Sequence, residues 1–524
     1  MEYFEIDQDN NTKKKKDKQK NSKLNRISLL HLLILFSLLS ILFFLFLDFI
    51  FPKGLQEKKD EKKEENPNKD SNYFSLIKSL ETNPHYHTEF LIDLVSNYNK
   101  IDFNNFERNL KITVQKIYSI INNEKENEDA YIILSSIYGA FLADSMGSFC
   151  EFKQFNKKNH LEIFSKNTGY VFRPGQVTDD SEMAMSQAYA IMDNGNIEEL
   201  NENLIYYYYL IWYNSHPLDI GITTRNALNI LKLDENNNIK NLLFTEKIKH
   251  QIERKNSGSL ANGLLMRISP ILCWFYMINK KYIKETLKSE NSVKYYELYY
   301  KILKNVEKDS QLTHPNRENA VSGAIFIFMG LCAMERIYSG KQILNMLEIL
   351  FNDNNFEINN EEKILKNHFI NIISDIKKED FIEDIYFGNL SNLMGYYLHS
   401  FKLTLYYLYK FDEMCQKNHI KDIYNKIIFS ICDFGGDTDT NAAIVGMILG
   451  PLIGINNFDK RYLDIFLNFY SKNRVIYTNA FIYYYAMHLI QNSSDNNHNY
   501  NKNLGEKINF NYFKMIYNFL YKNI

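Results

Sequence analysis

The stretch that decides the fold is GGDTDTNAAIVGMILG, residues 435–450. It begins with a glycine-rich turn and an acidic cluster, and it continues as a run of small and aliphatic residues typical of a helix. An earlier stretch, TDDSEMAMSQAYAIMDNG at residues 178–195, follows the loop RPGQ at residues 173–176 and has the same order of acids and then helical pattern. The chain therefore places two acidic clusters at two predicted helix starts.

Helical periodicity continues outward from these clusters over residues 129–492, for example in AYIILSSIYGAFLAD and ENAVSGAIFIFMGLCAMERIYSG. The chain has 20 Gly and 8 Pro against 38 Tyr and 37 Phe, which disfavours a turn-rich β architecture. We therefore predict an all-α domain at residues 129–492, with a helical extension at 73–128 before it and a C-terminal tail at 493–524.

The N-terminal region contains an apolar run, ISLLHLLILFSLLSILFFLFLDFIF, at residues 27–51. Its length suits one helix across about 30 Å of hydrocarbon. The long polar lead and the lack of an A-x-A-like cleavage site disfavour a signal peptide. We predict a basic disordered tail at 1–26, a single transmembrane helix at 27–51 and a charged linker at 52–72. The lysines before the span predict a cytoplasmic N-terminus, and hence a domain on the luminal or extracellular side.

Charge and cysteine content exclude several classes of protein. The formal net charge is −2, from 61 basic and 63 acidic residues, so no nucleic-acid partner is expected. The five cysteines are scattered without CxxC spacing, and we expect reduced, mostly buried thiols rather than disulfides or a zinc site. The oligomeric state has no signature in the sequence.

The two acidic clusters allow two interpretations. Asp and Thr are favoured at helix N-caps and in first turns, where they satisfy free N–H groups. Together, however, the clusters supply four carboxylates and two threonine hydroxyls, all hard oxygen donors, without a nearby His or Cys set that would indicate zinc or copper. This inventory suits Mg²⁺, as a pair of ions if the two helix starts meet in space.

Six motifs, in order, resemble the ADP-ribosylglycohydrolase family. They are GxxxxDxxG at residues 139–147 with Glu151, TDD at 178–180, DIGxTTR at 219–225, SLANGxxMRxxP at 259–270, TH at 313–314 and GGDxDTxA at 435–442. The DIGxTTR segment most resembles the dinitrogenase-reductase-activating type, which removes ADP-ribose from arginine. The resemblance implies a compact, orthogonal all-α domain with two Mg²⁺ ions, or Mn²⁺ as a substitute, at the base of a cleft.

The resemblance also implies roles for individual acids. The metal ligands would be Thr178, Asp179, Asp180, Asp437, Asp439 and Thr440, and the ions would hold the 2″ and 3″ hydroxyls of the distal ribose. The catalytic candidates are Glu151, Asp180 and Asp219, one of which would assist the attack of water on C1″. Asp219 would face the departing group, and because a carboxylate pairs with a guanidinium through two hydrogen bonds, it favours an arginine linkage.

Candidate substrate-binding residues follow from the same motifs. They are Gly147, Gly221, Ser259, Asn262, Gly263, Met266 and His314. The loop at 259–266 resembles a diphosphate cradle, in which small residues let backbone N–H groups approach phosphate oxygens. His314 matches a family histidine near the substrate. Without the resemblance, the loop would be a turn and the Thr–His pair a capped helix start.

The predicted activity is hydrolysis of the N- or O-glycosidic bond between ADP-ribose and a protein side chain, arginine first. The alternatives are serine-linked ADP-ribose, O-acetyl-ADP-ribose, poly(ADP-ribose), or a silent ADP-ribose-binding or structural protein like the lens crystallins of the family. The retained acids disfavour the silent alternative, because clustered carboxylates repel one another without a cation. The segments 232–256, 276–310 and 341–380 resemble lengthened connections.

Overall fold

The computed structural model describes residues 101–151, 172–230, 244–357, 359–387 and 394–493. Within these ranges the protein is helical, and its extended backbone pairs only in an isolated bridge between Ala261 and Tyr396. The predicted all-α fold is therefore confirmed. The predicted tail, transmembrane helix and linker at residues 1–72 lie outside the described residues.

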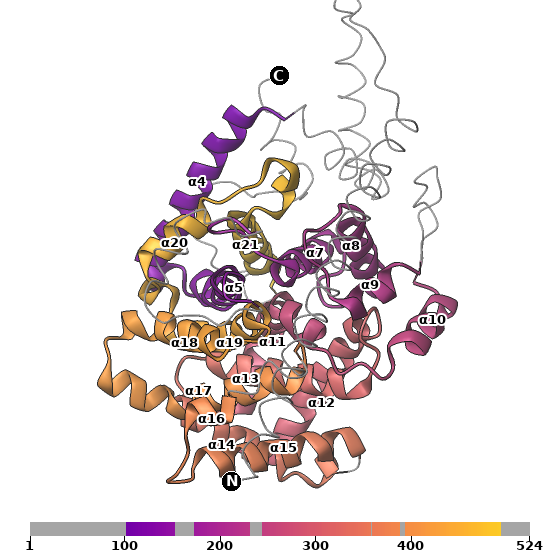
Figure 1. The fold of residues 1–524 in the computed structure, drawn as a ribbon, viewed down its shortest axis with the longest axis vertical. Coiled ribbons are helices and arrows are strands. Elements are labelled where there is room, and N and C mark those ends of the chain that lie inside the picture. Colours follow the sequence, from indigo (N-terminus) through magenta and orange to yellow (C-terminus); the bar gives the residue numbers. More distant parts are fainter. Residues whose placement is uncertain (1–100, 152–171, 231–243, 358, 388–393, 494–524) are drawn as a thin grey trace, which may run out of the picture. The chain divides into compact units, whose positions relative to one another are not determined.

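The helices are arranged as in Figure 1. Their bounds are α4 Phe103–Asn122, α5 Glu128–Gly147, α7 Asp179–Asp193, α8 Glu202–Asn214, α9 Ile222–Leu228, α10 Glu246–Asn256, α11 Ser269–Leu287, α12 Ser292–Ser310, α13 Arg317–Met334, α14 Gly340–Phe351, α15 Asn360–Ile376, α16 Glu383–Phe387, α17 Tyr397–Lys417, α18 Ile420–Phe434, α19 Thr438–Ile453, α20 Lys460–Leu467 and α21 Ile482–Asn492. Short 3-10 turns link several of them, among which η3, Asn262–Arg267, contributes to the site described below.

Helices α5 and α19 pack against each other at the centre of the domain (Figure 1). A methyl group on Gly139 would lie 2.4 Å from the Gly446 carbonyl oxygen, and one on Gly446 would lie 2.1 Å from the Gly139 carbonyl oxygen. A methyl group on Gly450 would likewise meet the Ser135 carbonyl oxygen at 2.1 Å. The two backbones are in direct contact, which explains why residues 435–450 combine glycines with small aliphatic residues.

Helix α5 is long and apolar enough to span a membrane by length and composition, the one such helix among the described residues. Its apolar window is fully buried inside the domain, where α11, α18, α19 and α21 pack around it. It is therefore a core helix, hydrophobic on all sides because other helices cover all its sides.

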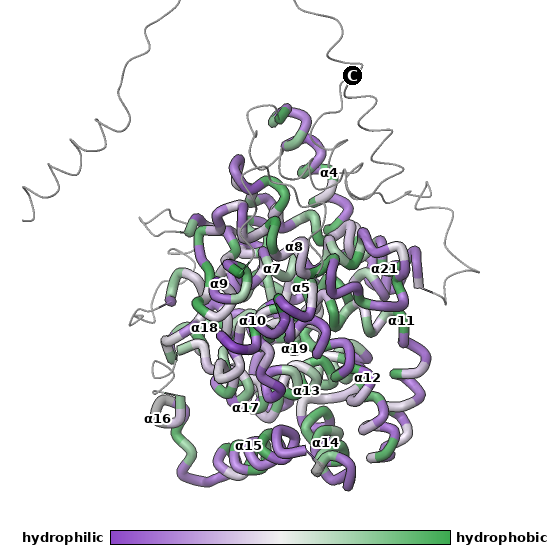
Figure 2. Tube along the Cα trace, turned by 90° about the vertical axis from the view of Figure 1, so that its right-hand side faces the viewer, coloured by the Kyte–Doolittle hydropathy of each residue, from purple (hydrophilic) through white to green (hydrophobic). Residues whose placement is uncertain are grey.

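Further helices surround the central pair. Helices α7, α13, α17 and α18 pack on α19, and α12, α14 and α15 form an outer layer on α13 and α17. Ring contacts join this outer layer, such as Tyr299 with Phe356 at 5.1 Å between centroids. Figure 2 shows hydrophilic and hydrophobic residues alternating along α12 and α15. Residues 276–310 and 341–380 are thus largely packed helices rather than plain connections.

Helix α4 lies within the segment predicted as a helical extension. Asp102 caps it, since its carboxylate accepts the N–H of the third residue along, Asn105, at 3.2 Å. The helix packs on the C-terminal part of the domain through the rings of Phe106 and Phe481 and through a hydrogen bond of 2.9 Å between the hydroxyls of Thr113 and Tyr484. It is integral to the packed core.

Replacing Gly446 with alanine tests the central contact. The added methyl group would lie 2.1 Å from the Gly139 carbonyl oxygen, so the helices must separate, and we expect the free energy of unfolding to fall by about 1–3 kcal/mol. Urea unfolding of the full-length chain measures this. Gly195→Ala is the control, because a methyl group there has nothing within 4 Å. Equal stability of the two variants would contradict the backbone contact.

Candidate active site

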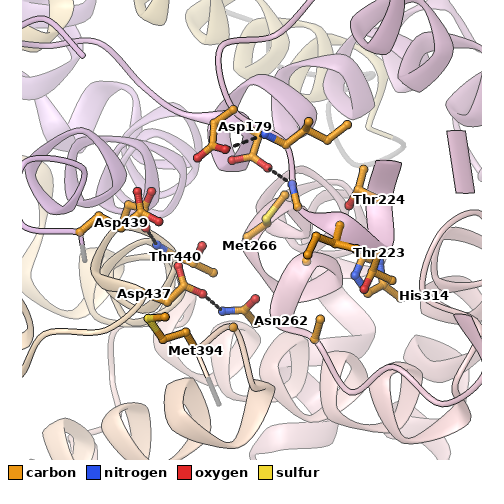
Figure 3. Close-up of a pocket in the computed structure, with 18 residues that line it drawn as sticks. Asp179, Thr223, Thr224, Asn262, Met266, His314, Met394, Asp437, Asp439 and Thr440 are labelled. Atoms are coloured by element: carbon orange, nitrogen blue, oxygen red, sulfur yellow. Dashed lines mark hydrogen bonds between the residues drawn. The ribbon is translucent and has the colours of Figure 1, made fainter. Parts of the chain in front are cut away.

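A cavity of about 430 Å³ opens between the starts of α7, α9 and α19. Figure 3 shows Asp437 and Asp439 on one side of it and Thr223 and His314 on the other, with Met266 between them. The predicted site residues that line the cavity are Glu151, Asp179, Asp219, Gly221, Asn262, Gly263, Met266, His314, Asp437, Asp439 and Thr440. The sequence motifs thus converge on one place.

The other four predicted site residues are Gly147, Thr178, Asp180 and Ser259, and they support the cavity from behind its lining. A methyl group on Gly147 would lie 2.5 Å from Asp439 Cα, so this glycine lets α5 approach the start of α19. Ser259 Oγ shares a hydrogen bond of 2.8 Å with Thr223 Oγ1. We therefore expect Gly147 and Ser259 to act through their neighbours rather than by touching a ligand.

The start of α7 is held by its own cap and by α5. Thr178 is the N-cap, and its hydroxyl donates to Asp180 Oδ2 at 3.0 Å. Asp144, in the last turn of α5, accepts the backbone N–H groups of Thr178 at 3.1 Å and Ser181 at 3.2 Å, and also the Ser181 hydroxyl. One buried carboxylate therefore fixes the backbone that carries Asp179 and Asp180.

The start of α19 follows from its glycines. Gly435 and Gly436 have φ of 75° and 81°, a left-handed conformation that side chains disfavour, and they turn the chain from α18 into α19. Asp437 is the N-cap residue, and Asn262 Nδ2 donates to its Oδ2 at 2.7 Å. The acidic cluster is thereby tied to the loop predicted to cradle a diphosphate.

The two helix starts meet in space. Thr440 Oγ1 on α19 donates to Asp180 Oδ2 on α7 at 3.2 Å, although the two residues are 260 positions apart in the chain. The N–H of Gly221, which precedes α9, donates to Asp179 Oδ2 at 3.2 Å. The starts of α7 and α19, which carry the six predicted metal ligands, therefore lie side by side.

Three carboxylates from different parts of the chain approach one another closely at the cavity. Ligand oxygens of Glu151, Asp219 and Asp439 all lie within 4.8 Å of one another. Glu151 and Asp219 are partly exposed, and Asp439 is buried. Such a group can hold a cation between its oxygens.

The environment raises the pKa values of four acids of the site, Glu151, Asp179, Asp180 and Asp439. Burial is the main cause for Asp179, Asp180 and Asp439, whose pKa values lie well above their usual range, and the charges of nearby carboxylates add to it. Burial and then the charges of Asp437 and other acids raise the pKa of Glu151 to about 9. Without a positive partner, the fold disfavours the charged forms.

Divalent cations fit this donor set. Asp180 Oδ1 is buried and has no hydrogen-bond partner among the described residues, while Oδ2 accepts the hydroxyls of Thr178 and Thr440. A buried carboxylate oxygen without a partner is costly, and a cation would satisfy it. The donors are all oxygens, which Mg²⁺ and Mn²⁺ accept.

Seven residues that line the cavity were not predicted as site residues. Five of them lie within the quoted motifs, namely Ile220, Ile222, Thr223, Thr224 and Ala261, and the other two lie outside every motif. Met394 and Gly395 line the cavity, and the Gly395 carbonyl accepts the Asn262 N–H at 2.7 Å. Gly395 has φ of 78°, and a methyl group on it would lie 3.6 Å from Asp437 Oδ2. A single Met–Gly pair 132 positions after Asn262 has no local signature. Asp144 stood in a quoted motif, but its supporting role was not predicted.

Fold and site together define an all-helical enzyme domain with an acidic cavity suited to divalent cations. Residues 127–480 match the family model described as ADP-ribosylglycohydrolase. This match covers more than half of the chain, and the protein belongs to the ADP-ribosylglycohydrolase family. It is therefore a hydrolase of glycosidic bonds, and the conjugates on which this family acts contain ADP-ribose.

Two similar proteins accompany the family match. A protein of Acanthamoeba polyphaga mimivirus, by name an ADP-ribosyl glycohydrolase, is 28% identical over 356 residues, which cover 65% of this chain and 92% of that protein. A solved chain described as part of an ADP-ribosylglycohydrolase-related protein complex is 16% identical, with a TM-score of 0.44, covering 69% of this chain and 100% of its own.

The cysteine prediction is confirmed. All five cysteines lie in the described part of the chain and are free of disulfides, and four of them are buried, with Cys415 partly exposed. Burial raises the pKa of the Cys273 and Cys332 thiols above their usual range. These thiols are packing residues rather than nucleophiles.

The pKa of Glu151 predicts how stability depends on pH in EDTA. Because the folded state raises this pKa from 4.5 to about 9, the folded protein keeps a proton that the unfolded chain releases. The contribution is fully present below about pH 4.5 and is lost as the pH rises toward 9. We expect the free energy of unfolding to fall over this interval, and to fall less steeply in Glu151→Gln.

Chemical denaturation across this pH range measures the slope. Glu297→Gln is the control, because Glu297 is exposed on α12 and far from the acidic cluster in sequence. Its profile should follow that of the wild type. An equally steep loss of stability in Glu151→Gln and the wild type would contradict the assigned environment of Glu151.

Proposed function

We propose that this protein uses Mg²⁺ to hydrolyse the bond between ADP-ribose and arginine side chains of modified proteins. The observation that carries the choice of arginine is the place of Asp219 at the cavity, where its carboxylate oxygen lies within 4.8 Å of that of Glu151. A guanidinium is planar and cationic and pairs with carboxylates through parallel N–H bonds. Membership of the family supports the ADP-ribose half of this proposal, and the carboxylates at the cavity support the arginine half.

The metal ions in this proposal are held by the six residues at the two helix starts. These are Thr178, Asp179, Asp180, Asp437, Asp439 and Thr440. Bound divalent cations would offset the charge of the four aspartates, keep neighbouring carboxylates ionised and polarise substrate oxygens. The unpartnered Oδ1 of Asp180 supports this assignment, because a buried carboxylate oxygen without a donor is costly unless a ligand satisfies it.

The three catalytic candidates differ in their access to the substrate. Asp180 is 1% exposed, and its Oδ2 already accepts two hydroxyl groups. Glu151 and Asp219 line the cavity. This contrast favours Glu151 or Asp219, rather than Asp180, as the group that exchanges protons with the substrate.

We assign the transfer of the proton to Glu151 and the binding of the departing guanidinium to Asp219. Ionised Glu151 accepts a proton from the water that attacks C1″ and returns it to the departing nitrogen, so the C1″–O bond forms, the C1″–N bond breaks and no net proton is consumed. Asp219 accepts N–H groups of the guanidinium and keeps it oriented during departure. The backbone N–H of the next residue, Ile220, donates to Asp219 Oδ1 at 2.8 Å and so limits the rotation of this carboxylate.

The opposite side of the cavity suits the diphosphate and the remaining ADP moiety. Asn262, Gly263 and Met266 come from the 3-10 turn η3, where the absence of a side chain on Gly263 leaves room for the His314 ring. Thr223 and Thr224 add hydroxyl groups from the first turn of α9. Neutral donors and small residues are the usual means of holding a diphosphate close to backbone.

Release of ADP-ribose by the purified full-length protein tests the proposal. We expect hydrolysis of ADP-ribosyl-arginine peptide with Mg²⁺ and none with EDTA. Asp439→Ala should lower kcat/KM at least about 100-fold, because it removes a ligand oxygen from the centre of charge stabilisation. The control Asp422→Ala changes an exposed acid in the first turn of α18 and should keep wild-type turnover. Turnover by Asp439→Ala near the wild-type rate at saturating Mg²⁺ would contradict the metal assignment.

The linkage is tested separately with matched arginine-linked and serine-linked ADP-ribosyl peptides. Asp219→Asn keeps the shape of the side chain but loses the charge that attracts a guanidinium. We expect it to lower turnover of the arginine conjugate far more than that of the serine conjugate. A wild type that prefers serine-linked ADP-ribose, O-acetyl-ADP-ribose or poly(ADP-ribose), or that binds ADP-ribose without any release, would replace the arginine assignment with that alternative.

We also propose that residues 27–51 anchor the protein in a membrane with the N-terminus in the cytoplasm. The uninterrupted apolar run and the preceding lysines support this. Two N-x-S sequons, at Asn389 and Asn492, report the side of the domain in a eukaryotic host. A mobility shift reversed by glycosidase is expected if the domain faces the lumen, and absence of glycan on both sites would favour the opposite orientation.

A further inference from the structure

Arg267 belongs to the MRxxP motif, yet it does not line the cavity. It is 0% exposed and forms an ion pair of 3.0 Å with Asp309, which is equally buried. Removing two charges from water is costly unless further hydrogen bonds satisfy them. The hydrogen-bond partners of this guanidinium therefore indicate which residues it holds in place.

Each side of the ion pair is fully engaged. Arg267 Nη1 donates to the Gly263 carbonyl oxygen at 2.9 Å, and Nη2 donates to Thr313 Oγ1 at 2.7 Å. On the other side, the Tyr209 hydroxyl donates to Asp309 Oδ1 at 2.6 Å, and the guanidinium lies over the Tyr209 ring, 4.8 Å from its centroid. The guanidinium is thus held in one orientation and reaches Gly263, which lines the cavity, and Thr313, the residue before His314.

The donor in the hydrogen bond between Thr313 and His314 can be inferred from the other partner of Thr313. Thr313 Oγ1 lies 2.8 Å from His314 Nδ1. Arg267 can only donate, so it uses a lone pair of Thr313 Oγ1 and leaves the threonine proton for another acceptor. His314 Nδ1 provides that acceptor if it carries no proton. The reverse arrangement would leave the threonine proton without this partner in a buried place.

The surroundings of His314 agree with this direction. Its exposed fraction is 1%. Burial, and then the positive charge of Arg267, hold the pKa of His314 well below its usual range, so the ring is neutral. A neutral ring with a bare Nδ1 carries its single proton on Nε2. A methyl group on Gly263 would lie 2.7 Å from this Nε2, so the glycine leaves room for the ring at the cavity wall.

We propose that Arg267 and Thr313 are positioning residues that fix His314 as the Nε2–H tautomer and so present a neutral hydrogen-bond donor to an acceptor oxygen of the ADP-ribose moiety. The inference rests on the proposed function for the identity of the ligand only. The tautomer itself is a property of the free protein. The same guanidinium holds the Gly263 carbonyl, so the donor and the loop beside it are set by one buried group.

The tautomer is measured by ¹⁵N NMR of the full-length protein labelled at histidine, with the His314 signals identified by their loss in His314→Gln. We expect a protonated Nε2 and a bare, hydrogen-bonded Nδ1 in the wild type. Thr313→Val keeps the shape of the side chain but removes the proton donor, and we expect it to populate the Nδ1–H form. Thr313→Ser restores the hydroxyl and should restore the wild-type signals.

Affinity for ADP-ribose, measured by calorimetry on the same proteins, gives the functional readout. Thr313→Val should weaken binding by about 3- to 10-fold, the usual effect of losing one neutral hydrogen bond, and Thr313→Ser should not. Thr404→Val is the control, since Thr404 is equally buried but its hydroxyl bonds only to the Ser400 carbonyl within α17. It should leave both the His314 signals and the affinity unchanged.

The outcomes separate this inference from the proposed function. A wild-type His314 protonated on Nδ1, or a Thr313→Val variant with unchanged His314 signals, would overturn the inference even if the protein releases ADP-ribose. A wild type with the expected tautomer but no hydrolytic activity would leave the positioning role standing and remove the proposed function. Unchanged affinity in a Thr313→Val variant whose tautomer has shifted would overturn the donor role of His314.

Discussion

Two helix backbones touch at the centre of this protein, at Gly139 of α5 and Gly446 of α19. The contact leaves no room for a side chain on either glycine, so the spacing of the two helices cannot vary with the size of neighbouring residues. The same line of contact continues to the site, where Gly147 lies against the backbone of Asp439 and accepts the hydroxyl of Thr438 at 2.8 Å. The position of Asp439 is therefore set by the core rather than by a loop.

Helix α5 orients the other acids as well. Asp144 accepts N–H groups from Thr178 and Ser181 and thereby fixes the start of α7, and Glu151 follows a few residues after the end of α5. The segments that carry Asp179, Asp180 and Asp439 are thus held by this buried helix, and the segment that carries Glu151 continues from it. Placing mutually repelling acids within a few ångströms of each other requires such a rigid support. Asp144 adds to this repulsion, because its charge contributes to the raised pKa values of Asp180 and Asp439.

The sequence allowed prediction of whatever has a local signature. Apolar periodicity predicted the all-α fold, the scattered cysteines without CxxC spacing predicted free thiols, and glycines followed by acids predicted the starts of α7 and α19. The convergence of these starts could not be derived locally, since the bond between Thr440 and Asp180 joins residues 260 positions apart. The supporting carboxylate of Asp144 and the cavity wall at Gly395 were missed for the same reason. Which of the acids reach a ligand and which stand behind them also depends on packing that no short motif encodes.

Helix α19, which packs against α5, is synthesised long after α5. Thr438 lies 291 positions after Gly147, and at a synthesis rate of about 5–20 residues per second the ribosome needs about 15–60 s to bridge that distance. During this time α5 is an apolar segment of membrane-spanning length without the helix that covers it. Its fate until then depends on the neighbours translated earlier, such as α7 and α11, and on chaperones that keep it away from other apolar surfaces. A domain whose central contact joins distant segments therefore stays prone to aggregation for longer during synthesis, even if the folded domain is stable.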